Sequence, residues 1–324
     1  MLSRVADSLY WLGRYLERTE NYARFLDVNF NLCLDLPPGV QEQWKPLIAA
    51  TGDLISYEKR YEDYERENAI FFLTFDRENN NSIINSVSYA RENGRMIREN
   101  IAAETWEAIN DLYHFMNYAE KKKIWRKENP HEFFIKVKQK VLLIYGIVKT
   151  TAFREEGWYF NQVGQHLERA DKTSRILDVK YHLLLPTVHD VGSPLDFLHW
   201  AALLKSVSGF NSYRRNYGKT DPASVVEYLL LNQFFPRSIY YCIKQAEYYL
   251  RSISGNSEGK YNAAEKCIGN LRSHLEFGEI NEVISIGLHE YLDDLQLKIN
   301  DISNKIHAHY FEIQPNFAVE NMEQ

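Results

Sequence analysis

One stretch of this sequence is written twice. Residues 11–28 read W-L-G-R-Y-L-E-R-T-E-N-Y-A-R-F-L-D-V, and residues 163–179 read V-G-Q-H-L-E-R-A-D-K-T-S-R-I-L-D-V. Glu20 recurs as Asp171, and eight further residues recur unchanged 151 positions later: Gly13, Leu16, Glu17, Arg18, Arg24, Leu26, Asp27 and Val28, matched by Gly164, Leu167, Glu168, Arg169, Arg175, Leu177, Asp178 and Val179. The chain must therefore accommodate two equivalent charged helices, which constrains its architecture more than any other feature.

The repeat continues beyond these helices at a spacing of 156. The matching pairs are Trp44 and Trp200, Leu47 and Leu203, Ser56 and Ser212, Tyr57 and Tyr213, Tyr61 and Tyr217, Leu73 and Leu229, Ser82 and Ser238, Ile83 and Ile239, and Ala90 and Ala246. Solenoid repeats are shorter, about 20–50 residues. The sequence predicts one compact domain over 1–324, an internally duplicated helical bundle. Its two repeats, about 1–125 and about 126–310, are expected to be related by a pseudo-twofold axis, with a loose tail at 311–324.

Composition and pattern predict an all-α fold. The 324 residues include only 15 Gly and 9 Pro, and no segment alternates as a strand would. Ser3 is predicted to cap the first helix, and Pro236 to lie in the first turn of another. Besides the second copy of the repeat, helices are expected at residues 3–34, 41–52, 82–98, 102–118, 130–153, 196–207, 223–231, 236–253, 261–277 and 279–310.

Bulk properties exclude several classes of function. The net charge of -6 argues against a general nucleic-acid binder, which needs a basic surplus. Three cysteines without metal-ligand spacing favour a reducing compartment. The N-terminus lacks the apolar core of a signal peptide, and no run of about 18 apolar residues follows. The sequence therefore predicts a cytoplasmic protein without nucleic-acid or membrane partners.

Two stripes run along the repeated helices. An apolar seam is expected to pack the two helices together through Leu12, Leu16, Leu26, Leu167 and Leu177. The second stripe lies about 100° round each helix, at the edge of the core. Its members are Gly13, Glu17, Glu20, Arg24 and Asp27 in the first copy and Gly164, Glu168, Asp171, Arg175 and Asp178 in the second. We expect these charges to be partly buried.

The charged stripe provides the candidate site. Four carboxylates converge if the helices meet, but neither copy has the Glu-x-x-His motif of helical di-iron sites. Three interpretations remain open: a salt-bridge ladder that fixes the packing, an arginine site for a polar peptide or phosphate-like ligand, and a metal site. We predict no metal and no cofactor. The ligand-binding candidates are Arg14, Glu17, Arg18, Glu20, Arg24, Glu168, Arg169, Asp171 and Arg175.

Other motifs give weaker signals. Arg91, Glu92 and Arg95 form a secondary candidate, since arginine forks suit carboxylate or phosphate recognition, although a solvated charged face is the favoured interpretation of them. His307 and His309 point to different faces of a helix and make a poor metal pair. No phosphate-binding glycine loop and no nucleophile elbow occurs in the sequence.

Three parts of the sequence carry recognisable motifs: the N-terminal L-S-R-V-A-D-S-L-Y-W-L-G-R-Y-L-E-R-T-E-N, the central A-R-E-N-G-R and T-W-E-A-I-N, and the second G-Q-H-L-E-R-A-D. Together they resemble the bacterial alpha-E domain family over nearly the whole chain. The resemblance implies an all-helical protein associated with a circularly permuted ATP-grasp protein and a transglutaminase-like peptidase. This chain departs from the family pattern at residues 79–83, which lack a proline, and at Gln165, where many relatives carry Arg.

The sequence and the resemblance together predict an accessory or binding protein of an ATP-dependent peptide synthesis or modification system. Its expected partners are the ATP-grasp protein or the peptide. The alternative is an enzyme with a carboxylate and arginine site at the repeat interface, performing metal-dependent or amide-group chemistry. The arginines adjacent to the carboxylates argue against an acid/base role, because they lower the pKa that a general base needs raised.

Overall fold

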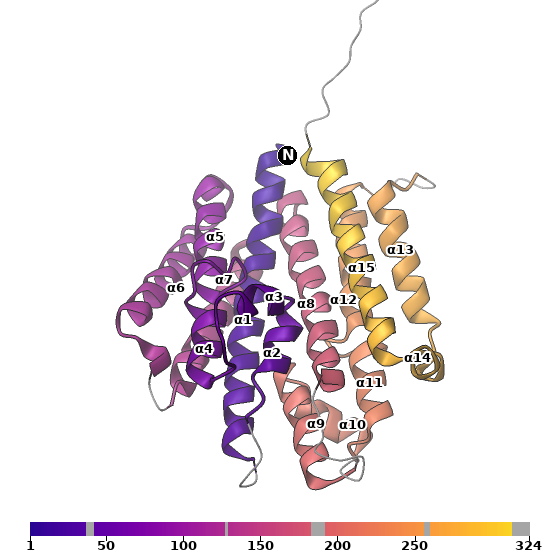
Figure 1. Cartoon of the computed structure of the whole chain (residues 1–324). Helices are drawn as coiled ribbons and strands as arrows, with labels where there is room; N and C mark the ends of the chain where they lie inside the picture. The colour runs from indigo at the N-terminus through magenta and orange to yellow at the C-terminus, as the bar shows by residue number, and fades with distance from the viewer. Residues whose placement is uncertain (37–41, 127–128, 183–191, 256–259, 313–324) are drawn as a thin grey trace, which may run out of the picture.

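The computed structural model describes residues 1–36, 42–126, 129–182, 192–255 and 260–312. Within these residues the chain forms fifteen α-helices and no strand, which confirms the all-α class (Figure 1). The helices are α1 (Ser3–Leu34), α2 (Lys45–Thr51), α3 (Leu54–Glu58), α4 (Arg66–Thr74), α5 (Ile83–Met96), α6 (Ala103–Lys121), α7 (His131–Thr151), α8 (Glu156–His182), α9 (Pro194–Ser206), α10 (Phe210–Tyr217), α11 (Pro222–Leu230), α12 (Ile239–Ile253), α13 (Ala263–Glu276), α14 (Ile280–Ile286) and α15 (Leu288–Ile306).

The two repeated segments form α1 and α8, which stand side by side at the centre of the molecule (Figure 1). Helices α5 and α7 pack against α1, whereas α12 and α15 pack against α8. The short helices cross over, since α2 packs on α8 and α9 packs on α1. Both central helices are therefore covered by helices from either side of the chain's midpoint.

The apolar seam is buried as its spacing predicts. Leu12, Leu16, Leu26, Leu167 and Leu177 are each at most 2% exposed, and α1 packs along α8, so the expected contact between the repeat helices is confirmed. The predicted start of the 82–98 helix is confirmed, because Ser82 caps α5 and its side chain accepts a hydrogen bond from the Asn85 backbone N–H. The predicted cap at Ser3 is wrong, since Ser3 is already helical and Leu2 precedes the helix without a side-chain cap.

Local backbone chemistry corrects three helix predictions. Gly287, with a φ of 103°, interrupts the expected helix at 279–310 and separates α14 from α15. Pro236 lies before α12 rather than in its first turn, because Ser238 caps that helix. Helices α4 and α10 went unpredicted, as segments of 9 and 8 residues are too short to show a clear periodicity.

The ends of two predicted segments need separate mention. Residues 313–324 of the predicted tail lie outside the described residues, as does Gln41, the first residue of the predicted 41–52 helix, which in the structure begins at Lys45. Phe311 ends a short π-helical turn, His307–Phe311, and packs with its ring 5.5 Å from the ring of Tyr10 and 5.6 Å from that of Phe160. The chain therefore returns to the N-terminal half of α1 near its own end.

Candidate functional site

Two glycines allow α1 and α8 to touch. A Cβ atom on Gly13 would lie 2.3 Å from the backbone oxygen of Asn161, and one on Gly164 would lie 2.2 Å from the backbone oxygen of Tyr10. No larger residue fits without separating the helices. The close approach brings the charged stripes of both helices into one buried cluster, which we call the charged cluster: Arg14, Glu17, Arg18, Glu20, Arg24, Glu168, Arg169, Asp171, Lys172, Arg175 and Arg237.

Glu17 is fully buried and is held mainly from the other half of the chain. Arg169 donates from Nε and Nη2 to its two carboxylate oxygens at 2.8 and 2.7 Å. Arg237 Nη1 donates at 3.2 Å, the Tyr145 hydroxyl at 2.8 Å and the Gln165 amide at 3.3 Å. Burial alone would raise the Glu17 pKa, but the two arginines outweigh burial and hold that pKa well below its usual range.

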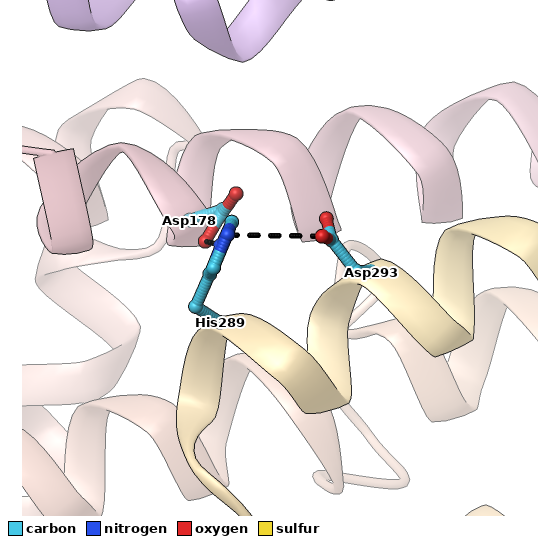
Figure 2. A group of neighbouring side chains, drawn as sticks. All are labelled: Asp178, His289 and Asp293. Atoms are coloured by element: carbon cyan, nitrogen blue, oxygen red, sulfur yellow. Dashed lines mark hydrogen bonds and ion pairs between the residues drawn. The ribbon is translucent and has the colours of Figure 1, made fainter.

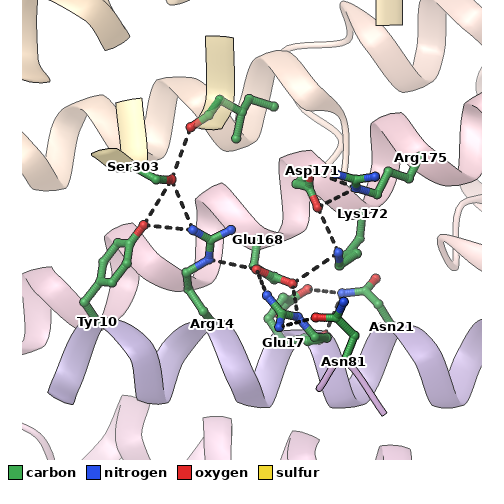
Figure 3. Close-up of polar contacts among 12 residues, drawn as sticks. Tyr10, Arg14, Glu17, Asn21, Asn81, Glu168, Asp171, Lys172, Arg175 and Ser303 are labelled. Atoms are coloured by element: carbon green, nitrogen blue, oxygen red, sulfur yellow. Dashed lines mark hydrogen bonds and ion pairs between the residues drawn. The ribbon is translucent and has the colours of Figure 1, made fainter. Parts of the chain in front are cut away.

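Glu168 is equally buried, and three cations surround it (Figure 3). Arg14 donates from Nε at 2.8 Å, and Arg18 donates from Nε and Nη2 at 2.7 and 3.2 Å. Lys172 Nζ lies 3.4 Å away on the same helix. These charges overcome the effect of burial and hold the Glu168 pKa well below its usual range. Glu17 thus pairs with the Arg169 next to Glu168, and Glu168 pairs with the Arg18 next to Glu17.

The second carboxylate of each helix is joined to the first by a shared cation. Arg237 reaches Glu20 at 2.8 Å as well as Glu17, and Arg24 also pairs with Glu20. On α8, Lys172 lies 2.8 Å from Asp171 as well as close to Glu168. Both motif copies therefore form a carboxylate, cation, carboxylate chain along the helix.

The burial of these carboxylates exceeds the sequence expectation. Glu17, Glu20 and Glu168 are 0% exposed, so the prediction of partial burial at the core edge is wrong for them. The physical reason is that helices from both halves cover the second stripe as well as the seam. Arg175 donates from Nε to both Asp171 oxygens at 3.0 Å. Burial would raise the Asp171 pKa, but Lys172 and Arg175 lower it to about 2.

Several members of this site were absent from the sequence prediction. Arg237, Lys172 and Tyr145 all contact its carboxylates. The repeat contains a signal for Arg237, which stands 156 residues after Asn81, directly before the matched serines. Asn81 enters the cluster too, because its side-chain oxygen accepts from Arg18 Nη1 at 2.9 Å.

The cluster carries more positive than negative charge. Seven cations face four carboxylates: Arg14, Arg18, Arg24, Arg169, Lys172, Arg175 and Arg237 against Glu17, Glu20, Glu168 and Asp171. Burial and then repulsion from Arg237 lower the Arg24 pKa to about 9, although the charges of Glu17 and Asp27 act against this shift. Its Nε–H is buried and donates no hydrogen bond within the described residues.

The secondary candidates lie apart from the cluster, on α5. Arg91 donates to Asn110 at 2.8 Å and to Glu92 at 3.0 Å, and its guanidinium lies 4.7 Å from the centre of the Tyr113 ring. Arg95 pairs with Glu92 at 2.6 Å and its side chain is 65% exposed. The structure does not bring these residues to the buried carboxylates, so they form a separate surface group.

Asp178, His289 and Asp293 form the one group of three carboxylate or imidazole side chains within the described residues that is spaced like metal ligands, with atoms within 4.8 Å of one another (Figure 2). His289 Nδ1 lies 2.8 Å from Asp178, and Nε2 lies 3.7 Å from Asp293. The hydrogen bond to Asp178 raises the His289 pKa. Because each ring nitrogen faces a carboxylate, a protonated histidine accounts for the arrangement.

Fold and site together define a class: an all-helical protein in which a Glu-Arg pair from each of two central helices forms reciprocal buried ion pairs. The chain belongs to the Alpha-E family, described as a predicted alpha-helical domain with a conserved ER motif, and the match spans residues 1–311. Glu17-Arg18 and Glu168-Arg169 fit that description. Within the part of the chain that the structure describes, no helix has the length and apolarity needed to cross a membrane.

Similar proteins include uncharacterized proteins of Mycobacterium bovis and Mycobacterium tuberculosis, each 23% identical to this chain. The similarity covers 94% of this chain and 36% of each relative, so the chain spans about a third of their length. No solved structure matches the chain.

Proposed function

We propose that this chain is an accessory or binding protein of an ATP-dependent peptide synthesis or modification system, and that its charged cluster recognises a carboxylate or acyl-phosphate group of a partner. The observation that carries the proposal is the surplus of cations, seven against four carboxylates. A salt-bridge ladder that served packing alone would gain nothing from three extra buried charges, because each one costs desolvation energy.

An anionic group would complete the charge balance of the cluster. Arginine forks bind carboxylates and phosphates through two parallel charge-assisted hydrogen bonds. The side chains of Arg18 and Arg24 are each 12% exposed and that of Arg175 is 21% exposed, whereas those of Glu20 and Glu168 are 0% exposed and that of Asp171 is 5% exposed. The accessible edge of the cluster is therefore cationic.

The enzyme alternative finds less support in the electrostatics of the cluster. A carboxylate that acts as general base or acid near neutral pH needs a raised pKa. The pKa values of Glu17, Glu168 and Asp171 are all lowered by neighbouring cations, despite burial. These carboxylates stay ionised and paired, which suits the positioning of arginines better than proton transfer.

The choice of partner rests on the family resemblance and on domain length. The aligned region makes up only 36% of the mycobacterial relatives, so in those proteins the Alpha-E region is joined to further chain. We expect the Alpha-E region of this chain to contact a partner, as it can contact the segments that accompany it in those relatives. We propose the circularly permuted ATP-grasp protein or its peptide as that partner, in the cytoplasm.

The same proposal includes the origin of the cluster. We infer that the chain is a duplication of a helical unit of about 150 residues, with halves related by a pseudo-twofold axis. Reciprocal contacts support it: Arg18 pairs with Glu168 as Arg169 pairs with Glu17, and Gly13 and Gly164 each face the backbone of the other helix. A duplication explains why one cluster contains two versions of each group.

Calorimetry of the purified chain with the ATP-grasp protein tests the proposal. Arg18→Lys keeps the positive charge but loses the planar guanidinium that can form two parallel hydrogen bonds. Arg169→Ala removes both the charge and the guanidinium. We expect binding to weaken at least tenfold in each variant, and the matched control Arg95→Ala, an exposed arginine outside the cluster, to bind as wild type. Melting curves confirm that each variant is folded before binding is compared.

Two results would contradict this function. Unchanged binding by folded Arg18→Lys and Arg169→Ala removes the cluster from the interface. Multiple turnover of a peptide substrate by the isolated chain, abolished in Glu17→Gln, establishes the enzyme instead.

A further inference from the structure

A pocket lies between α12 and α13, on the outer helices of the C-terminal half. None of its lining residues takes part in the ion pairs of the charged cluster. Its volume is about 340 Å³, and its lining includes Tyr240, Lys244, Glu247, Tyr248, Arg251 and Arg272. That volume lies at the lower end of the range for small-molecule sites, about 300–1,000 Å³. The hollow is therefore large enough for a small ligand.

A buried carboxylate organises the floor of this pocket. Glu247 is 7% exposed and is held from both sides, by Arg251 Nη2 at 2.7 Å and by Arg272 Nε at 3.0 Å. Arg272 also pairs with Glu276, whose side chain is 38% exposed at the rim. A Cβ on Gly269 would lie 3.3 Å from Glu247 Oε1, so the absence of a side chain at this position of α13 leaves room for the ion pair between Glu247 and Arg251.

One cation in the pocket, Lys244, lacks an anionic partner within the described residues. Arg251 pairs with Glu247 through Nη2, while its Nε–H and the Glu247 Oε1 atom are buried without a hydrogen bond among those residues. Lys244 is exposed and makes no ion pair, and its ammonium lies 5.8 Å from the centre of the Tyr240 ring. Three cations thus face two carboxylates, which leaves one positive charge uncompensated in a hollow lined by tyrosine rings.

We propose that this pocket binds a small zwitterionic ligand with a net charge of about -1, an acidic amino acid or a dipeptide that contains one. One ligand carboxylate pairs with Lys244 and Arg251, and the ligand ammonium pairs with Glu276 at the rim. Tyr248, which is 61% exposed and whose ring centre lies 5.3 Å from that of Tyr249, covers the apolar part of the ligand. This inference goes beyond the proposed function and does not depend on it.

The internal repeat provides a comparison within the same molecule. At the spacing of 156, Glu247 and Arg251 correspond to Arg91 and Arg95 of α5. In the first half an arginine, Arg91, stands at the position of the buried Glu247, and the carboxylate that Arg91 shares with Arg95 is that of Glu92, whose side chain is 47% exposed. The pocket chemistry is therefore specific to the second half, and Arg95 supplies a matched control position.

Calorimetry of the full chain with three dipeptides tests the pocket: alanyl-glutamate, alanyl-glutamine and alanyl-lysine, which differ mainly in charge. We expect alanyl-glutamate to bind at least fivefold more tightly than the other two. We expect Lys244→Gln and Tyr248→Ala each to weaken the binding of alanyl-glutamate at least fivefold. Both side chains are exposed, so the melting temperature should not change. Arg95→Gln should bind as wild type.

The proposal is overturned if alanyl-glutamate gives no heat at millimolar concentration, or if the three dipeptides bind equally. It is also overturned if Lys244→Gln and Tyr248→Ala both bind as wild type. The charged cluster and the pocket can be tested separately, because the variants of one leave the other intact. If the Arg18 or Arg169 variants lose binding to the ATP-grasp protein but still bind the dipeptide, the two sites are independent.

Discussion

Glu17 and Glu168 are the same residue in two copies of one motif, yet the protein stabilises them differently. Glu17 receives two arginines and three neutral donors, with Tyr145 and Gln165 at 2.8 and 3.3 Å and Asn21 at 2.9 Å. Among the residues that the structure describes, Glu168 contacts cations and no neutral donor. At the spacing of 151, Gln165 corresponds to Arg14 and Asn21 to Lys172, so neutral groups in one half match charges in the other.

The comparison shows where the charge surplus resides. Around Glu168 and Asp171 stand Arg14, Arg18, Lys172 and Arg175, four cations for two carboxylates, whereas Glu17 and Glu20 face Arg24, Arg169 and Arg237. The Glu168 side is therefore the more cationic half. On the Glu17 side, neutral hydrogen-bond donors replace some of the cations. The arginines on that side therefore depend more on Glu17 and Glu20 to balance their charge.

The largest expected effect comes from removing one carboxylate at a time. Glu17→Ala leaves Arg169 without its carboxylate, and breaking a buried pair in this way costs about 3–5 kcal/mol of unfolding free energy. Glu168→Ala should cost less, because Arg14 keeps Tyr10 and Ser303, and Arg18 keeps Asn81. Urea denaturation of both variants measures the difference. A larger loss for Glu168→Ala would mean that repulsion among its cations outweighs their remaining hydrogen bonds.

The contact between the halves is the next test. Gly13→Ala places a methyl group 2.3 Å from a backbone oxygen, so α1 and α8 must separate. We expect a loss of about 1–3 kcal/mol, the usual cost of overpacking. Gly146→Ala is the control, since nothing lies within 4 Å of its Cβ, and it should be neutral or slightly stabilising. Equal melting temperatures for both variants would disprove the close contact.

Tyr145→Phe removes a neutral donor that only Glu17 has. The hydroxyl donates to the carboxylate at 2.8 Å, and a hydrogen bond to a charged group is worth about 1.5 kcal/mol or somewhat more. Thermal denaturation should therefore show a moderate loss of stability, smaller than for Glu17→Ala. If the variant is as stable as wild type, the arginines alone hold Glu17 and the contrast between the halves is one of geometry only.

The smallest effect concerns pH. Contact with Asp178 raises the His289 pKa, so this pair contributes its full stability below about pH 6.5 and loses it as pH rises through the folded-state pKa. The pKa of Asp171 is lowered to about 2, so its contribution is present above its unfolded value and fades as pH falls toward 2. Melting temperatures from pH 5 to 8 for wild type and His289→Gln should converge at the alkaline end. A constant difference across that range would exclude the histidine as its source.

The helical class, the positions of α1 and α8 and the candidate arginines and carboxylates followed from local pattern. Helical periodicity around Leu16 and around Leu167 predicts which face of each helix is buried, because the periodic pattern depends only on residues three or four positions apart. Gly287 escaped prediction as a helix break because a lone glycine is tolerated in helices, and its positive φ is a property of the folded backbone.

The repeated motif by itself determined that two Glu-Arg helices exist and that their carboxylates can pair with arginines. Only the tertiary structure decided the partners, because Arg237 and Tyr145 lie 220 and 128 residues from Glu17 in the chain and reach it through the packing of α12 and α7 around the central pair. Burial was decided at the same level. The sequence of a helix determines the direction in which a side chain leaves that helix. The packing of helices from both halves determines how far the carboxylate is exposed to solvent, and therefore its pKa.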